Sequence, residues 1–153
     1  VPTQADDPYE TMSIDDLMAM NVMGVVSKNS LLVMWTVGSH LEQAIKLGRA
    51  WGFSYVTDLF YWVKPQIGMG YHTRKMVEPC LLFKRGKGLP VLSHSVRQAI
   101  HAPRRQHSRK PDEQYDRLDA LYGTDIRRLE LFARQQRAGW MSWGNEVGVF
   151  DHA

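Results

Sequence analysis

The sequence predicts an α/β domain in which helices pack on a sheet. Apolar runs typical of buried strands alternate along the chain with segments whose apolar residues have helical spacing. A length of 153 residues fits a single domain over residues 1–153, and 44% hydrophobic with 23% charged residues is an ordinary globular composition. No apolar run approaches the roughly 20 residues of a membrane span. The one cysteine, Cys80, suits a protein of the reducing cytoplasm.

The N-terminal part predicts a short helix and then a strand. Ser13 and Asp16 have the spacing of a capping box, and the helix that they open is expected to run through Met20. Residues 31–37 are a continuous apolar run bounded by polar residues, which predicts a buried strand.

A second helix and a second strand are expected next. Ser39 and Glu42 again have capping-box spacing, and they predict a helix over residues 40–51 that ends at the glycine that follows. Residues 53–63 are rich in aromatic and β-branched side chains and predict the next strand. Because ligands of α/β sheets bind beyond the carboxyl ends of strands, residues 36–38 are one place to look for a site.

The remaining elements are expected to be shorter. After a glycine-containing loop, a strand is predicted at residues 80–83 and a further short one near residues 96–100. Pro111 is expected to start a helix that ends at Gly123. Residues 128–132 predict the last strand, and its carboxyl end is the second place to look for a site.

A basic segment without any acidic residue lies between Glu78 and Asp112. It holds eight of the 19 Lys and Arg residues and leaves the rest of the chain net negative. The eight are Lys84, Arg85, Lys87, Arg97, Arg104, Arg105, Arg109 and Lys110. A local positive field beside a negative remainder is expected of a surface that meets phosphate, and a solvated loop is the alternative interpretation.

The sequence contains no pattern for a metal site or for nucleophilic catalysis. Its histidines lack the spacing of zinc ligands, and neither a Gly-x-Ser-x-Gly elbow nor a phosphate-binding glycine loop is present. Cys80 lies in an apolar run, so we expect it to be a core residue and not a nucleophile.

Several stretches, in the same order along the chain, resemble a known family of adenine methyltransferases. The most specific are Ser108-Arg-Lys-Pro-Asp-Glu113 and Glu130-Leu-Phe-Ala-Arg134, and the others are Tyr9-Glu-Thr-Met-Ser13, Trp51-Gly-Phe53, Trp62-Val-Lys64, Gly139-Trp140 and Trp143-Gly-Asn145. On these residues the chain is similar to the family of the eukaryotic mRNA adenosine methyltransferase catalytic subunit. Gly70-Tyr-His-Thr-Arg74 is similar to the bacterial and phage DNA-modifying branch of that family.

The resemblance implies a permuted Rossmann-like sheet flanked by helices, and methyl transfer from S-adenosylmethionine to the exocyclic N6 amine of adenine. In that family the contacts to the methyl donor come late in the chain. Carried over motif by motif, the expected cofactor-binding residues are Lys110, Glu130, Leu131, Phe132, Arg134 and Asn145. A cation, an amide and an apolar slot suit the carboxylate, ribose and adenine of this cofactor.

The catalytic motif of the family departs from its usual form in this chain. Relatives have Asp-Pro-Pro and an aromatic residue: the acid and a proline carbonyl accept the two N–H groups of the amine, and the ring stacks on the flipped base. The candidates here are Asp6, Asp7, Pro8 and Tyr9, with Asp7 in place of the first proline. Because the chain begins with Val1 and not Met, we expect the true motif and its central strand to lie upstream, and this chain alone to be inactive.

For the substrate, the resemblance implies a nucleic acid, with DNA expected ahead of RNA, in a bacterial or phage-infected cell. The expected contacts are Lys64, Tyr71, Thr73 and Arg74 to the flipped base and its neighbours, and Arg104, Arg105 and Arg109 to phosphate. The alternatives are a non-catalytic nucleic-acid-binding partner subunit and an unrelated Rossmann-like cofactor binder. The sequence leaves a homodimer or heterodimer open.

Overall fold

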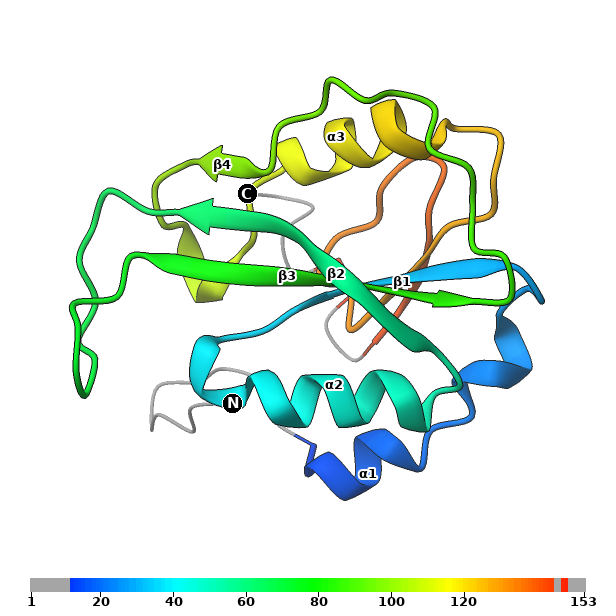
Figure 1. The fold of residues 1–153 in the computed structure, drawn as a ribbon, viewed down its shortest axis with the longest axis horizontal. Coiled ribbons are helices and arrows are strands. Elements are labelled where there is room, and N and C mark those ends of the chain that lie inside the picture. Colours follow the sequence, from blue (N-terminus) through cyan, green and yellow to red (C-terminus); the bar gives the residue numbers. More distant parts are fainter. Residues whose placement is uncertain (1–11, 145–146, 149–153) are drawn as a thin grey trace.

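The computed structural model describes residues 12–144 and 147–148, which form two sheets and the helices packed on them (Figure 1). Within these residues the larger sheet has four strands in the order β1–β3–β2–β4. They are β1 (Ser30–Trp35), β2 (Ser54–Val63), β3 (Val77–Arg85) and β4 (Ala99–His101). β3 runs antiparallel to β1 and β2, whereas β4 runs parallel to β2. The smaller sheet is the parallel pair of β5 (Leu129–Leu131) and β6 (Met141–Trp143).

Helices cover both faces of the larger sheet, which confirms the predicted α/β class. α1 (Ile14–Met18) and α2 (Leu41–Ala50) lie on one face, and α3 (Glu113–Tyr122) lies on the opposite face (Figure 1). Short 3-10 helices complete the described elements: η1 (Val22–Val25), η2 (Gly38–His40) and η3 (Gln106–Ser108). The layers are therefore helix, sheet and helix.

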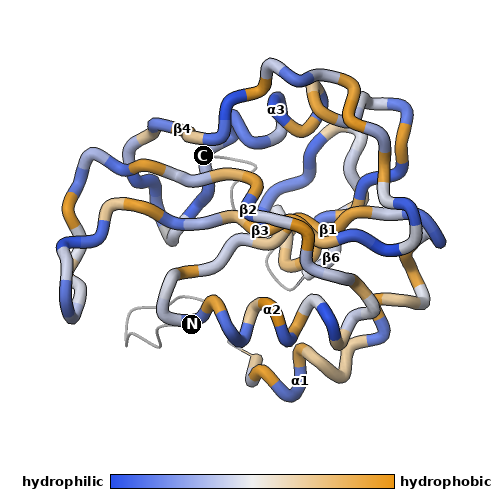
Figure 2. Tube along the Cα trace, viewed as in Figure 1, coloured by the Kyte–Doolittle hydropathy of each residue, from blue (hydrophilic) through white to orange (hydrophobic). Residues whose placement is uncertain are grey.

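The core has two parts, one on each face of β3. Leu81 and Phe83 pack on the α2 side, with Val22, Ala44, Leu47, Trp51 and Phe53. Cys80 packs on the α3 side, with Phe60, Ile100, Leu118 and Tyr122. Figure 2 shows the hydrophobic residues gathered along these central strands and alternating with hydrophilic ones along α2. Cys80 has no exposed surface, and burial raises the pKa of its thiol, so the prediction that it is a core residue is confirmed.

The first predicted helix cap is confirmed and the second is wrong. The Ser13 hydroxyl accepts a hydrogen bond from the Asp16 backbone N–H at 3.1 Å, although α1 ends at Met18, before the predicted Met20. Ser39, by contrast, lies inside η2, and its hydroxyl pairs with the His40 ring at 3.1 Å. His40 is therefore the N-cap residue of α2 and makes no side-chain cap hydrogen bond.

Strand β1 differs from its prediction because of its place in the sheet. The apolar run predicted a buried strand, yet all six residues of β1 are only half-buried, since β1 lies at the edge of the described sheet and pairs with β3 alone. Its side chains nevertheless pack on both faces. Leu31, Val33 and Trp35 contact the α3-side core, and Leu32 and Met34 contact the α2-side core.

The later elements occur where they were expected, with shifted ends. The short strand predicted near residues 96–100 is β4, which begins at Ala99 because its parallel pairing is with Tyr61–Val63 at the end of β2. α3 begins at Glu113 after the N-cap Asp112, two residues beyond the predicted Pro111, and ends at Tyr122 before the C-cap Gly123, whose φ of +81° explains the glycine.

Candidate functional site

A cluster of two tryptophans, two lysines and one glutamate lies at the carboxyl ends of β1 and β2. We call Trp35, Trp62, Lys64, Glu78 and Lys110 the tryptophan–lysine cluster. Trp62 and Glu78 are directly paired across β2 and β3, so their side chains share one face of the sheet. Lys64 follows Trp62 by two residues and returns to that face, which is the face that α3 covers.

The ions of this cluster are paired at hydrogen-bond distance and shielded from solvent. Glu78 accepts from Lys64 Nζ at 2.9 Å on one carboxylate oxygen and from Lys110 Nζ at 2.8 Å on the other. The Lys64 side chain is 11% exposed and the Lys110 side chain 24%. Both ammonium groups lie near the Trp62 ring, at 5.2 and 5.4 Å from its centroid. Lys110 Nζ also lies 5.9 Å from the centroid of the Trp35 ring, so the cluster combines three cation–π contacts with one shared carboxylate.

The electrostatics of the cluster favour an ionised Glu78 and leave a net positive charge. Burial on its own raises the pKa of the Glu78 carboxyl, but the charges and hydrogen bonds of Lys110 and then Lys64 outweigh it and hold the pKa below its usual value. Two ammonium groups against one carboxylate make the cluster cationic, so it is suited to meet an anionic group of a ligand.

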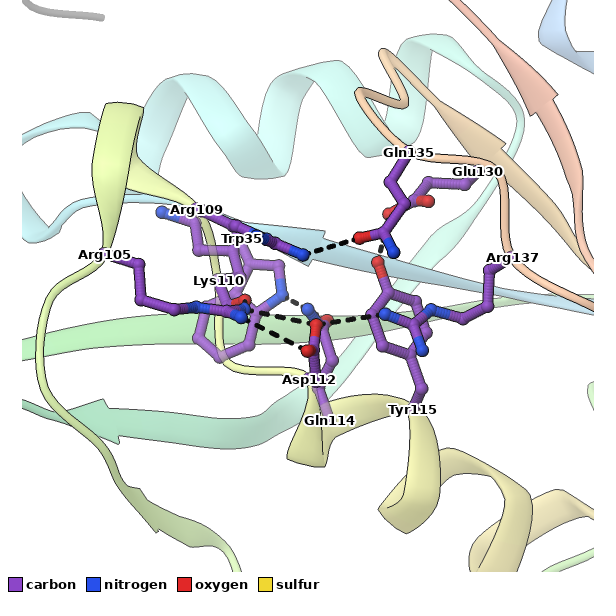
Figure 3. A network of polar contacts seen from close by, with 10 residues as sticks. All are labelled: Trp35, Arg105, Arg109, Lys110, Asp112, Gln114, Tyr115, Glu130, Gln135 and Arg137. Atoms are coloured by element: carbon purple, nitrogen blue, oxygen red, sulfur yellow. Dashed lines mark hydrogen bonds and ion pairs between the residues drawn. The ribbon is translucent and has the colours of Figure 1, made fainter. Parts of the chain in front are cut away.

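A second ionic group joins the end of the basic segment to α3 and to the loop after β5 (Figure 3). Arg105 donates to both oxygens of Asp112, each at 3.2 Å, and also to the backbone carbonyl of Lys110. Arg137 donates to Asp112 from the opposite side at 3.0 Å. We call Arg105, Asp112 and Arg137 the Asp112 clamp. The hydrogen bonds from Arg105 contribute most to a pKa of Asp112 below its usual value.

Further contacts tie the loop after β5 to the start of α3. Arg137 stacks over the Tyr115 ring, 3.8 Å from its centroid, and the Tyr115 hydroxyl donates to the Glu130 carboxylate (Figure 3). Burial and then Glu130 raise the pKa of Tyr115, which keeps its hydroxyl a donor. Arg109 donates to Gln135 at 2.7 Å. Residues of the basic segment are thereby held against the strand expected to bind the cofactor.

A hollow of about 360 Å³ lies between α3 and this loop. It is lined by Tyr115, Asp116, Asp119, Arg128, Gln135, Gln136, Arg137, Ala138 and Trp140. A neighbouring hollow of about 460 Å³ shares Gln136, Arg137, Ala138 and Trp140 with it. None of the described residues predicted to bind the cofactor lines either hollow. They approach the smaller hollow, of about 360 Å³, through Tyr115, which lines it and bonds to Glu130.

The structure places the predicted cofactor residues in different settings. Lys110 belongs to the tryptophan–lysine cluster and Glu130 contacts Tyr115, while Leu131 packs toward the α2-side core and Arg134 is half-buried. Phe132 is 43% exposed, has a φ of +58° and makes an edge contact with the Trp143 ring at 5.4 Å. Asn145 lies outside the described residues.

The predicted nucleic-acid contacts are not all in one environment. Tyr71, Thr73 and Arg74 are exposed on the loop between β2 and β3, and Arg104 is exposed after β4. Lys64 is separated from them by its buried pairing with Glu78, and Arg105 and Arg109 are bonded to Asp112 and Gln135. The predicted catalytic residues, Asp6, Asp7, Pro8 and Tyr9, lie outside the described residues.

Sequence reasoning missed the acidic partners of the site. The sequence assigns no role in the site to Glu78 or Asp112, which mark the limits of the basic segment, yet each forms the centre of an ionic group. A usable signal existed for Glu78, since a hairpin that pairs residue 63 with residue 77 brings Glu78 opposite Trp62. Tyr115 and Arg137 had no comparable signal, because they meet only through tertiary packing.

Two findings bear on site classes that the sequence did not favour. The described part of the chain holds no group of three or more His, Cys, Asp or Glu residues placed to bind a metal ion. No described helix is both long and apolar enough to span a membrane. The expected cytoplasmic location stays a prediction.

Comparison with known proteins gives a consistent set of matches. The pattern of the MT-A70 family matches residues 3–146. Over 146 residues the chain is 34% identical to the type II methyltransferase M.MunI of a Mycoplasma species, covering 95% of this chain and 62% of that protein. It is 32% identical over 151 residues to a probable N(6)-adenosine-methyltransferase MT-A70-like of rice, covering 92% of this chain and 21% of the relative.

A shorter match is to the human N(6)-adenine-specific methyltransferase METTL4. The two sequences are 39% identical over 69 residues, which are 42% of this chain and 13% of the human protein. The chain therefore spans about three fifths of the Mycoplasma relative and much smaller parts of the plant and human ones.

Proposed function

The chain belongs to the MT-A70 family, and from this membership we propose that it is part of an enzyme that methylates the exocyclic N6 amine of adenine in a nucleic acid. The observation that carries the proposal is the family match over residues 3–146, together with relatives named as adenine or adenosine N6 methyltransferases. The tryptophan–lysine cluster supports it, because Lys110 of the Ser108–Glu113 stretch is fixed there, at the carboxyl ends of β1 and β2.

S-adenosylmethionine is proposed as the methyl donor, with Lys110, Glu130, Leu131, Phe132, Arg134 and Asn145 as its binding residues. The chemistry of the described residues fits this cofactor: Lys110 offers a cation to its carboxylate, Glu130 an acceptor to its ribose hydroxyls and Phe132 an exposed ring to its adenine. A Cβ at Gly144 would lie 2.9 Å from Phe132 Cα, so this glycine permits the close approach of the two segments. When bound, the cofactor supplies an electrophilic methyl group.

The polynucleotide is proposed to lie across the β2–β3 loop and the basic segment. Tyr71, Thr73 and Arg74 would contact the target base and its neighbours, and Arg104 a phosphate, all from exposed positions. DNA is proposed over RNA because Gly70–Arg74 resembles the bacterial and phage DNA-modifying branch of the family.

For catalysis, the proposal needs an acid and a carbonyl acceptor for the two amine N–H groups. Asp6, Asp7, Pro8 and Tyr9 are the candidates within this chain. We also propose that the complete fold is a permuted Rossmann-like sheet in which a further strand pairs with the open edge of β1. β1 is apolar on both faces, a pattern typical of an interior strand, yet it lies at the edge of the described sheet.

Methyl transfer from labelled S-adenosylmethionine to adenine-containing DNA tests the proposed function. The measurement compares this chain with a version of the protein that continues upstream of Val1. Activity in the longer version and none in the chain alone is the expected result, because Asp7 replaces the rigid proline of the family motif and one ångström of misplacement costs about a hundredfold in rate. Robust activity of the chain alone that is lost on Asp6→Ala would assign catalysis to residues 6–9 instead.

A non-catalytic partner subunit remains the second candidate, because Asp7 stands where the family motif has a proline. Such a subunit would bind the same DNA and transfer no methyl group in either version. The edge of the described sheet at β1 would then suit association with another chain, as a homodimer or a heterodimer.

A further inference from the structure

We propose that Lys64 and Glu78 are positioning residues that hold the ammonium group of Lys110 in place for an anionic group of the methyl donor. The inference rests on the proposed function, because it takes Lys110 as a cofactor ligand. It replaces the sequence-based expectation that Lys64 contacts the polynucleotide.

The environment of Lys64 argues against a contact with nucleic acid. Its side chain is only 11% exposed, its Nζ lies 2.9 Å from Glu78 and it lies 5.2 Å from the centre of the Trp62 ring. To reach a phosphate, Lys64 would have to leave a carboxylate that is itself 13% exposed, and the Glu78 oxygen that it leaves would be partly buried without its partner, which is costly. Lys64 is therefore committed to the cluster.

Glu78 allows two like charges to share one aromatic surface. Lys64 and Lys110 both approach the Trp62 ring, and without an anion between them their ammonium groups would repel each other. Glu78 gives one carboxylate oxygen to each lysine. An ammonium group has three N–H donors, so this contact fixes Lys110 and leaves it donors for a ligand.

Lys64 also sets the charge that a ligand meets. Lys110 is the more exposed of the two lysines, at 24% against 11%, so it forms the open end of the cluster. With Lys64 present, two cations share one carboxylate and the cluster carries a net positive charge. Without Lys64, the charge of Glu78 would cancel that of Lys110, and the attraction for an anionic group would be lost.

The test measures the affinity of two ligands for the intact protein by calorimetry. S-adenosylmethionine has the carboxylate, and 5′-methylthioadenosine lacks the amino-acid part. Lys64→Met should weaken the affinity for S-adenosylmethionine by about tenfold and leave the affinity for methylthioadenosine unchanged. Lys64→Arg, which keeps the charge, should retain most of the affinity for S-adenosylmethionine. Glu78→Gln should also weaken the affinity for S-adenosylmethionine alone, because one of the two oxygens that accept from the lysines becomes an NH2 donor, which cannot accept from an ammonium group.

The matched controls are Lys46→Met and Glu42→Gln, which alter an exposed ion pair on α2 with a spacing of 3.8 Å. Both should leave both affinities unchanged. The salt dependence of DNA binding is measured on the same variants. If Lys64→Met reduces the slope of log DNA affinity against log salt by about 0.7 to 0.9 and leaves the cofactor affinity unchanged, Lys64 contacts the polynucleotide and the inference is overturned.

Other outcomes separate this inference from the proposed function. Equal losses of affinity for both ligands would mean that Lys64 and Glu78 act only on the fold. Tighter binding of S-adenosylmethionine by Glu78→Gln would show that the net charge of the cluster, and not the position of Lys110, determines the affinity. Either result overturns the inference. If Lys110→Ala weakens the affinity for S-adenosylmethionine while Lys64→Met and Glu78→Gln leave it unchanged, the inference fails and the proposed function stands. A wild-type protein that binds neither ligand overturns both.

Discussion

Replacing Arg104 and Arg105 one at a time should separate the binding of nucleic acid from the stability of the site. The two residues are neighbours in the basic segment, but their environments differ. Arg104 is exposed, and within the described residues its guanidinium makes no hydrogen bond or ion pair. Arg105 donates to both oxygens of Asp112 at 3.2 Å and to the Lys110 carbonyl.

The size of each effect follows from these contacts. Arg104→Ala should remove one phosphate contact and reduce the slope of log affinity against log salt by about 0.9 on duplex DNA or about 0.7 on a single strand. Arg105→Ala should leave that slope unchanged. It should lower the free energy of unfolding by about 1 kcal/mol, because the ion pair is partly exposed and screened by solvent, at 28% for Arg105 and 50% for Asp112.

The assay combines fluorescence anisotropy of labelled DNA at several salt concentrations with urea unfolding of each variant. Arg49→Ala, an exposed arginine on α2 at the opposite layer, is the control and should change neither quantity. A reduced salt slope for Arg105→Ala with an unchanged unfolding midpoint would refute the reasoning. It would mean that Arg105 leaves Asp112 to bind phosphate.

Three further predictions follow from buried groups. The pKa of Glu78 is lower in the folded protein than its unfolded value of about 4.5, so Glu78 contributes fully to stability above that pH, and the contribution is lost as the pH falls through the folded pKa. Glu78→Gln should therefore flatten the acid side of a plot of unfolding free energy against pH. An unchanged plot would contradict the pairing of Glu78 with the lysines. Gly48→Ala should lower the free energy of unfolding by about 1–3 kcal/mol in a thermal unfolding measurement, because the overlap of the added Cβ with the Phe83 ring outweighs a helix-propensity gain of about 1 kcal/mol. A stabilised variant would show that Phe83 moves aside. Cys80 should resist a thiol reagent until the protein unfolds, and rapid labelling of the native protein would disprove its burial.

Much of the fold could be predicted because local signals agree with it. The apolar runs, the Ser13 cap and the glycines that end α2 and α3 act over a few residues, so the sequence displays them directly. The second capping box failed because η2 precedes α2, and capping-box spacing cannot show where a 3-10 turn will form. The prediction that β1 is buried was wrong, because an apolar run does not show whether a strand has one neighbour or two in the sheet.

The candidate site was harder to predict, because it is built by pairing across elements. A run of basic residues in the sequence does not show which acidic residues from other segments pair with it in the folded protein. Arg105 and Lys110 pair with Asp112 and Glu78, two acids just outside the acid-free segment, and Arg109 donates to the neutral amide of Gln135. The charge count therefore overstates the field that this part of the segment presents to a ligand.

The same pairing narrows the surface that we propose for nucleic acid. Once Lys64, Arg105 and Arg109 are assigned to internal contacts, the exposed members of the predicted set are Tyr71, Thr73, Arg74 and Arg104. Arg104 belongs with the other three, because its backbone N–H donates to Gln66 at 3.4 Å and its guanidinium lies beside Gly68 of the β2–β3 loop. This loop projects beyond the sheet (Figure 1). An exposed aromatic ring with cations around it suits an unstacked base and its phosphates, so the β2–β3 loop, more than the basic segment as a whole, is where a polynucleotide would be held.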